Sequence, residues 1–179
     1  QKKLRCVYPS VDVFALLNKT FSGGFTHANC SYVGLTLSDV ASVDIASSYP
    51  TQMLKHKFPS GKWHKLTEIP NVDVLTAMCK QYACIMEITY KNLVAKSDHH
   101  TISRHKCSIA DNAVVDNGRI VSGDYVTTYI TSVDFVVNRL FYDFDAVQIH
   151  QFYYCNYDYL PRPLIGVIID AYKRKTLLK

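Results

Sequence analysis

The stretch that decides the fold is QYACIMEITYKN, residues 81–92. In an extended chain, successive side chains point to opposite faces of a sheet. Cys84 and Met86 would therefore lie on one face and Ile85 on the other, so that both faces are mainly apolar. A strand that is buried on both faces belongs in the interior of a sheet. The stretch predicts a central strand.

Upstream of this strand, the pattern predicts a helix, a strand and a second helix. Helical spacing over 11–19 places one set of residues on a common face: Val11, Phe14, Ala15 and Asn18. The alternation in TLSDVASVDIA, residues 36–46, favours a strand with Val43 and Ile45 on the same face. A short helix is expected to open at Pro50, because the missing N–H of proline costs nothing in a first turn. We therefore expect Asp44 to be buried at a strand end, just before a helix.

Downstream of the central strand, the signals continue to mix strands and helices. The dipeptide Asn117-Gly118 predicts a tight hairpin turn, and residues 122–124 predict the turn that follows it. Thr131 or Ser132 can cap a helix over 133–144. A further strand over 146–155 and a last amphipathic helix complete the order. This mixture predicts an α+β fold with an antiparallel or mixed sheet.

Composition favours a folded chain without a membrane segment. Of the 179 residues, 48% are hydrophobic and 20% charged, which is enough apolar material for a core. No apolar run approaches the roughly 20 residues that span a bilayer. Six widely separated cysteines favour reduced thiols and a cytoplasmic location. The chain has no initiator methionine, so we expect it to have been cut from a longer one.

The charge suits a polyanionic partner, although solvation alone also accounts for such an excess. The net charge is +5. The basic excess lies at the two ends of the chain: Lys2, Lys3, Arg5, Lys173, Arg174, Lys175 and Lys179.

Two other groups of polar residues have a simpler interpretation. The segment DHHTISRHKC, residues 98–107, lacks the paired ligand spacing of a zinc site and is more typical of a loop. Asp143 and Asp145 could share a divalent cation if the chain is extended there. Because they stand at the end of a predicted amphipathic helix, surface acids are the more ordinary interpretation.

The run Asp44-Ile45-Ala46-Ser47-Ser48-Tyr49-Pro50 closely resembles motif A of family B DNA polymerases. The upstream SGGFTHAN, residues 22–29, is similar to the segment that precedes motif A in the protein-primed, phi29-like branch. The order of elements downstream resembles the insertion of that branch that is called TPR1. The resemblance implies three parts, namely a partial palm with motif A over 1–57, a TPR1-like insertion over 58–160, and a helix over 161–179 leading toward the fingers.

Within this family, the motif A aspartate holds two magnesium ions, and Asp44 matches it. The resemblance implies that Asp44 is catalytic, that Asp44 and Ile45 are metal ligands, and that Mg²⁺ is the cofactor. It also implies that Tyr49 lies under the sugar and excludes a 2′-hydroxyl. Ser48 departs from the family, which usually has leucine there. The implied nucleotide-binding residues are Ile45, Ala46, Ser47, Ser48 and Tyr49; no DNA-binding residue is assigned.

The implied function is that of a DNA-directed DNA polymerase of a phage or plasmid, a nucleotidyltransferase of DNA replication. Its partners would be primer-template DNA, deoxynucleoside triphosphates and a terminal priming protein, with no membrane. The sequence lacks the Tyr-x-Asp-Thr-Asp motif with the second catalytic aspartate, and the fingers motif Lys-x-x-x-Asn-Ser-x-Tyr-Gly. We therefore expect the isolated chain to be inactive. The alternative is a non-catalytic module that binds nucleic acid or protein and has kept a degenerate motif A.

Overall fold

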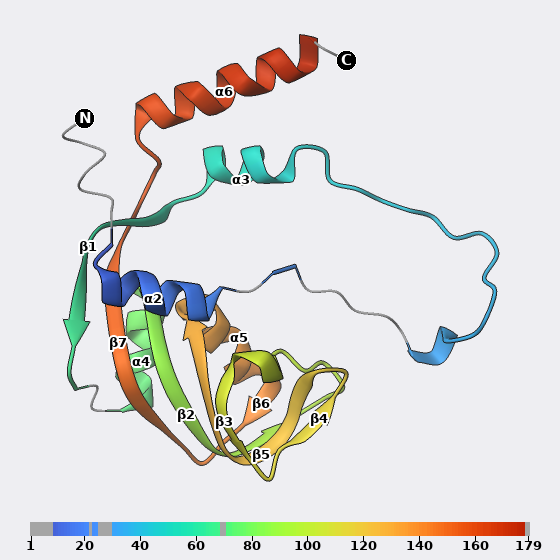
Figure 1. Ribbon diagram of the computed structural model, residues 1–179, viewed down its shortest axis with the longest axis vertical. Helices are drawn as coiled ribbons and strands as arrows, with labels where there is room; N and C mark the ends of the chain where they lie inside the picture. Colours follow the sequence, from blue (N-terminus) through green and yellow to red (C-terminus); the bar gives the residue numbers. More distant parts are fainter. Residues whose placement is uncertain (1–8, 22, 25–29, 69–70, 178–179) are drawn as a thin grey trace. The chain divides into compact units, whose positions relative to one another are not determined.

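The structure is a computed structural model that describes residues 9–21, 23–24, 30–68 and 71–177 (Figure 1). The chain divides into two compact units. The first, here called the sheet unit, comprises residues 1–21 and 59–158. The second, the helical unit, comprises residues 22–58 and 159–179. None of the described helices is long and apolar enough to cross a membrane.

The sheet unit is built on a curled sheet in which long strands pair side by side (Figure 1). The ladders that join β2 to β5, β6 and β7, and β5 to β3 and β4, are all antiparallel. The predicted α+β class with an antiparallel sheet is therefore confirmed. The main path of the sheet is β1 (Phe58–Leu66), β7 (Ala146–Asp158), β2 (Ala83–Ala95), β5 (Arg119–Thr131) and β3 (Cys107–Asp111), with β4 (Val114–Asp116) beside β5 and β6 (Tyr142–Asp143) beside β2.

Strand β2 lies in the middle of this path and is buried on both faces, as its sequence predicts. Met86 and Ile88 belong to the larger apolar cluster, which is covered by α4 (Val72–Gln81) and α5 (Ser132–Phe141). Ile85 points to the other face, where it packs with α2 (Val11–Thr20). The sheet is therefore a middle layer with helices on both sides (Figure 1).

Two predicted local signals are confirmed in the strands and helices around β2. Asn117 and Gly118 have φ angles of 45° and 74°, which are the left-handed values that a tight hairpin turn between β4 and β5 requires. The Thr131 hydroxyl accepts from the Asp134 N–H, and the Asp134 carboxylate accepts from the Thr131 N–H. This reciprocal capping box fixes where α5 begins.

The predicted turn at residues 122–124 is wrong, because β5 continues through it. A Cβ added to Gly123 would lie 2.8 Å from Cγ2 of Val126. In a straight strand, residues three apart are separated by about 10 Å. The strand therefore bends sharply at Gly123, and a side chain at this position would force Val126 to shift.

Helix α2 forms where the sequence predicts it, but it buries a different face. The structure buries Val13, Leu16 and Thr20, whereas Val11 and Phe14 are exposed. Both sets have helical spacing, so the periodicity alone does not distinguish them. Contact with Ile85 of β2 selects the buried one.

The helical unit contains α3 (Ser48–Lys55), α6 (Arg162–Leu177) and a 3-10 turn (Cys30–Tyr32). Helices α3 and α6 contact each other. The strand predicted over 36–46 is wrong, since these residues follow an irregular path. Alternation produces a strand only where another strand supplies backbone partners, and no strand of the described residues pairs with this segment.

Four cysteines whose side chains the structure describes are free and buried, as predicted for reduced thiols: Cys79, Cys84, Cys107 and Cys155. Cys6 lies outside the described residues.

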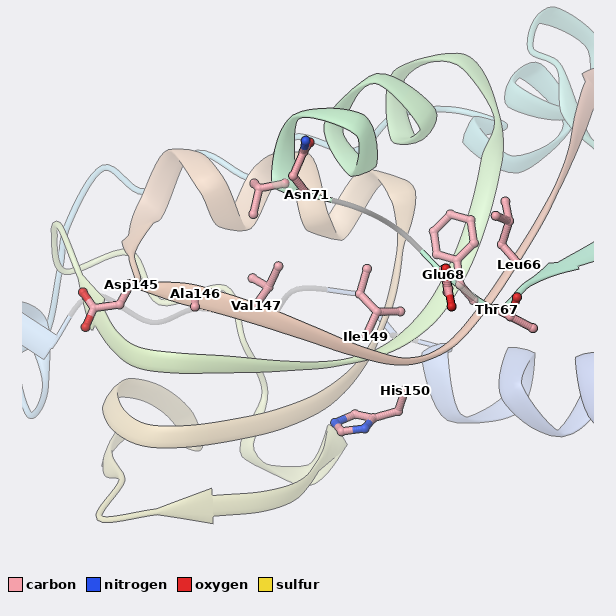
Figure 2. Close-up of a pocket in the computed structure, with 11 residues that line it drawn as sticks. Leu66, Thr67, Glu68, Asn71, Asp145, Ala146, Val147, Ile149 and His150 are labelled. Carbon is pink, nitrogen blue, oxygen red and sulfur yellow. The ribbon is translucent and has the colours of Figure 1, made fainter.

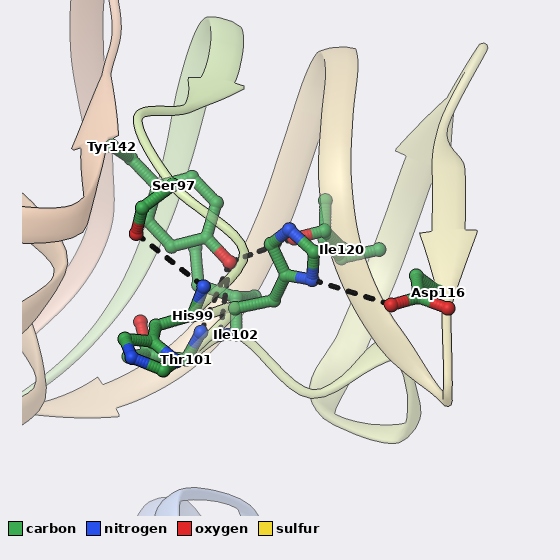
Figure 3. Close-up of polar contacts among 8 residues, drawn as sticks. Ser97, His99, Thr101, Ile102, Asp116, Ile120 and Tyr142 are labelled. Carbon is green, nitrogen blue, oxygen red and sulfur yellow. Dashed lines mark hydrogen bonds and ion pairs between the residues drawn. The ribbon is translucent and has the colours of Figure 1, made fainter. Parts of the chain in front are cut away.

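Tyr142 ties three parts of the sheet unit together through its buried hydroxyl (Figure 3). The hydroxyl accepts from the backbone N–H of Thr101 at 3.1 Å and of Ile102 at 3.3 Å. It donates to the Ile120 carbonyl at 2.7 Å. Burial raises the pKa of Tyr142, because the charged phenolate would lose its hydration. The phenol therefore stays neutral and keeps its donor.

We predict that Tyr142→Phe lowers the free energy of unfolding by about 1–3 kcal/mol, because buried backbone groups lose their partner. Urea unfolding followed by circular dichroism measures the loss. Tyr125→Phe is the matched control, since this ring is 46% exposed and its loss should stay within about 0.5 kcal/mol. Equal destabilisation by both substitutions would contradict the role of the Tyr142 hydroxyl.

Candidate functional site

The segment that resembles motif A lies at the start of α3 in the helical unit. Asp44 and Ile45 precede a turn, and the helix begins at Ser48. The helix thus begins two residues before Pro50, where the sequence analysis expected it to open. Pro50 is still in the first turn, where backbone N–H groups have no partner within the helix. Its ring is therefore tolerated.

Ser47 makes the turn into α3 with a backbone that is unusual for a residue with a side chain. Its φ of 56° and ψ of 37° lie in the left-handed region. Such a conformation costs on the order of 1 kcal/mol and persists where the surroundings hold it. The Ser47 hydroxyl donates to the Tyr172 hydroxyl of α6 at 3.0 Å, and its carbonyl accepts from the Thr51 N–H. The turn is therefore held by a side-chain hydrogen bond to α6 and by a backbone hydrogen bond to α3.

Sequence reasoning missed Tyr172, because 125 residues separate it from Ser47. Nothing in the local pattern of α6 indicates which of its side chains reaches the turn.

The expectation that Asp44 is buried at a strand end is wrong for this structure. Asp44 is exposed and follows an irregular segment. Its neighbours are also open to solvent: Ile45 is 74% exposed and Tyr49 is 85% exposed. An exposed carboxylate is solvated by water and needs no partner to offset burial. The segment that resembles motif A thus forms an open surface in the helical unit.

The oxygen donors of this surface are of the type that magnesium binds. Mg²⁺ takes hard oxygen ligands, keeps several waters, and is usually held by one or two carboxylates together with substrate phosphates. The Asp44 carboxylate and the Ile45 carbonyl are such donors. The described residues contain no group of three or more His, Cys, Asp or Glu side chains that could hold a metal ion. Further ligands would therefore have to come from elsewhere.

Asp143 and Asp145 contact different side chains. Asp143 forms an ion pair with Lys96 at 3.1 Å. Asp145 accepts from the side-chain amide of Asn92 at 2.6 Å. Separate partners hold the two carboxylates, which agrees with the simpler interpretation as surface acids.

The histidine-rich segment is a loop over 98–106 with a 3-10 turn, Arg104–Lys106, and Cys107 begins β3. His100 lies 3.8 Å from the carboxylate of Asp116 (Figure 3).

The sheet unit contains a hollow that the sequence analysis did not identify. It has a volume of about 770 Å³, between β7 and the start of α4 (Figure 2). Its wall includes the apolar Val147 and Ile149 and the acidic Glu68 and Asp145. We assign no chemistry to it.

The GGFT-like segment cannot be placed beside Asp44, since residues 22 and 25–29 lie outside the described residues.

Comparison with known proteins identifies similarity in fold alone. No family model and no curated protein matches the chain. Three solved structures match the chain, and all three are of phi29 DNA polymerase, with 18% sequence identity. The complex with primer-template DNA and incoming nucleotides has a TM-score of 0.69 over 95% of this chain. The orthorhombic crystal form has a TM-score of 0.63 over 93% of this chain, and the binary complex with primer-template DNA has a TM-score of 0.62 over 98%.

The similarity extends over nearly all of this chain but covers 28% of the polymerase chain in each case. The chain thus has the fold of part of a DNA polymerase.

Proposed function

We propose that this chain is the segment of a protein-primed DNA polymerase that carries motif A of the palm and the TPR1-like insertion. The observation that carries the proposal is that two independent features occur in the same chain. The fold is similar to part of a phage DNA polymerase along nearly the whole chain, and the run that resembles motif A stands at a strained turn that opens a helix. Either feature alone would support a weaker conclusion.

The proposal assigns residues 1–57 to the palm, 58–160 to the insertion and 161–179 to a helix toward the fingers. Primer-template DNA and nucleotides are bound by the similar polymerase, and we extend both to this chain as partners. A terminal priming protein is the third. The chain by itself would not extend a primer, because its sequence lacks the second catalytic aspartate and the fingers motif.

Asp44 would be the carboxylate ligand for magnesium, and the Ile45 carbonyl would assist it. Magnesium, when bound, neutralises charge on the triphosphate and favours attack by the primer hydroxyl. Backbone N–H groups over 45–48 and at the start of α3 would face the triphosphate, since N–H groups at the beginning of a helix attract anions. The exposed position of Asp44 fits this role, because both ion and substrate must reach it.

The coding sequence that follows Lys179 tests the proposal directly. We predict a Lys-x-x-x-Asn-Ser-x-Tyr-Gly motif followed by a Tyr-x-Asp-Thr-Asp motif, because two-metal phosphoryl transfer needs the remaining ligands. Sequencing that region gives the answer. A following sequence without either motif would favour the non-catalytic module.

Asp44→Asn in the longer polymerase should abolish primer extension while leaving DNA binding nearly unchanged. A lost metal ligand costs several kcal/mol in the transition state, on the order of a hundredfold or more in rate. Single-turnover extension and a gel-shift assay measure the two effects. Asp39→Asn is the matched control, since it removes an exposed acid from the same unit.

Because Asp44 is exposed, its substitution in this chain should change the free energy of unfolding by no more than about 0.5 kcal/mol. Loss of DNA binding equal to the loss of extension would argue against the assigned role.

Tyr49→Val in the longer polymerase should raise ribonucleotide insertion relative to deoxyribonucleotide insertion. In the complete polymerase, a 2′-hydroxyl that clashes with this ring would cost about 1–3 kcal/mol, which is on the order of 10- to 100-fold in selectivity. Single-nucleotide kinetics give the ratio of the two kcat/KM values. Tyr32→Val, a change at another exposed tyrosine of the helical unit, should leave this ratio unaltered. An unchanged ratio in active Tyr49→Val would exclude contact with the sugar.

A further inference from the structure

A second hollow of the sheet unit is lined by basic side chains from separate elements. Its volume is about 230 Å³, and its lining residues come from the last turn of α2, the 3-10 turn Arg104–Lys106, the beginning of β3 and the C-terminal part of β5. The lining contains three residues that can carry positive charge and two hydroxyls, but no carboxylate. The lining residues are Lys19, His105, Lys106, Cys107, Ser108 and Tyr129.

The two lysines are held in place by contacts with the walls of the hollow. The Lys19 ammonium lies 4.6 Å from the centre of the Tyr129 ring and donates to its hydroxyl at 3.4 Å. The Lys106 ammonium donates to the Thr20 carbonyl at 2.7 Å. Each ammonium has three donors, so each retains N–H groups beyond these contacts.

The positive charge of the hollow is poorly compensated. Within the described residues, neither lysine forms an ion pair with a carboxylate. Lys106 is half-buried, and burial lowers its pKa, with repulsion from Arg119 acting in the same direction; Asp134 acts in the opposite direction. An anion in the hollow would offset both the lost hydration and the repulsion.

A purely structural role accounts for only part of this arrangement. Lys106 satisfies a carbonyl at the C-terminal end of α2, which is where cations stabilise a helix. That role does not require Lys19 and His105 to lie beside the same hollow. The end of α2 carries about half a negative charge, and two full positive charges outweigh it.

We propose that this hollow binds a phosphate group. Lys19 and Lys106 would supply charged donors, the hydroxyls of Ser108 and Tyr129 would donate to the remaining phosphate oxygens, and His105 would add charge when protonated. The ligand is a phosphate of a nucleic-acid strand. The choice of nucleic acid as the molecule that carries the phosphate rests on the proposed polymerase function. The phosphate site itself does not, since the hollow lies in the sheet unit and Asp44 lies in the helical unit.

The first experiment tests whether the bound phosphate belongs to a nucleic-acid strand. It measures binding of a labelled single-stranded oligonucleotide to this chain by fluorescence anisotropy at several salt concentrations. Each phosphate contact contributes about 0.7 to the slope of log K against log salt. Lys19→Gln should reduce the slope by about this amount, which is about a fivefold loss of affinity at 0.1 M salt. Lys80→Gln is the matched control, because it removes the same charge from the last turn of α4, on the opposite face of the sheet.

Titration with inorganic pyrophosphate, followed by amide NMR shifts of Ser108 and Tyr129, tests the phosphate site itself. Shifts that Lys19→Gln removes and Lys80→Gln retains would support the site even if no polymerase motif follows Lys179. Shifts with pyrophosphate but no oligonucleotide effect would support a phosphate site and overturn the nucleic-acid carrier. If Lys19→Gln and Lys80→Gln behave alike with both ligands, the proposal is overturned, and the hollow serves only to cap α2.

Discussion

Burial of β2 on both faces is the constraint on which the sheet unit depends. Met86 and Ile88 are inaccessible on one face, and Ile85 is nearly so on the other. A sheet with two apolar faces needs cover on both sides. Helices α4 and α5 supply it on one side and α2 on the other. The bend at Gly123 lets β5 follow the curl of the sheet. The Tyr142 hydroxyl accepts from the backbone N–H of Thr101 in the loop after β2 and donates to the carbonyl of Ile120 in β5.

The same constraint positions the basic hollow. Helix α2 is held against the sheet by Val13 and Leu16, and this contact sets where its last turn lies. Lys19 and the Thr20 carbonyl are thereby brought to the side chains of Tyr129 and Lys106. An apolar contact thus determines the place at which the positive charges gather, although the charges themselves take no part in it.

The helical unit follows a different principle. Its turn at Ser47 is strained and fixed by a hydroxyl of α6, while the apolar side chains beside it, Val43, Ile45 and Tyr49, are exposed. Exposed apolar groups next to a fixed turn are typical of a surface that binds something. In our proposal, the nucleotide and the remainder of the polymerase would cover this surface. The Ser47 turn would then be set before they bind, which limits the entropy lost on binding.

The sequence by itself determined the elements whose signals are local: the central strand β2, the Asn117-Gly118 turn, the capping box of α5, and the resemblance to motif A. Each depends on side chains a few residues apart. Tertiary structure alone decided which stripe of α2 is buried, that residues 36–46 form no strand, that β5 passes through Gly123, and that Tyr172 holds Ser47. In each case, the deciding contact comes from a distant segment, and alternation or helical spacing is satisfied equally well by the arrangement that the chain does not adopt.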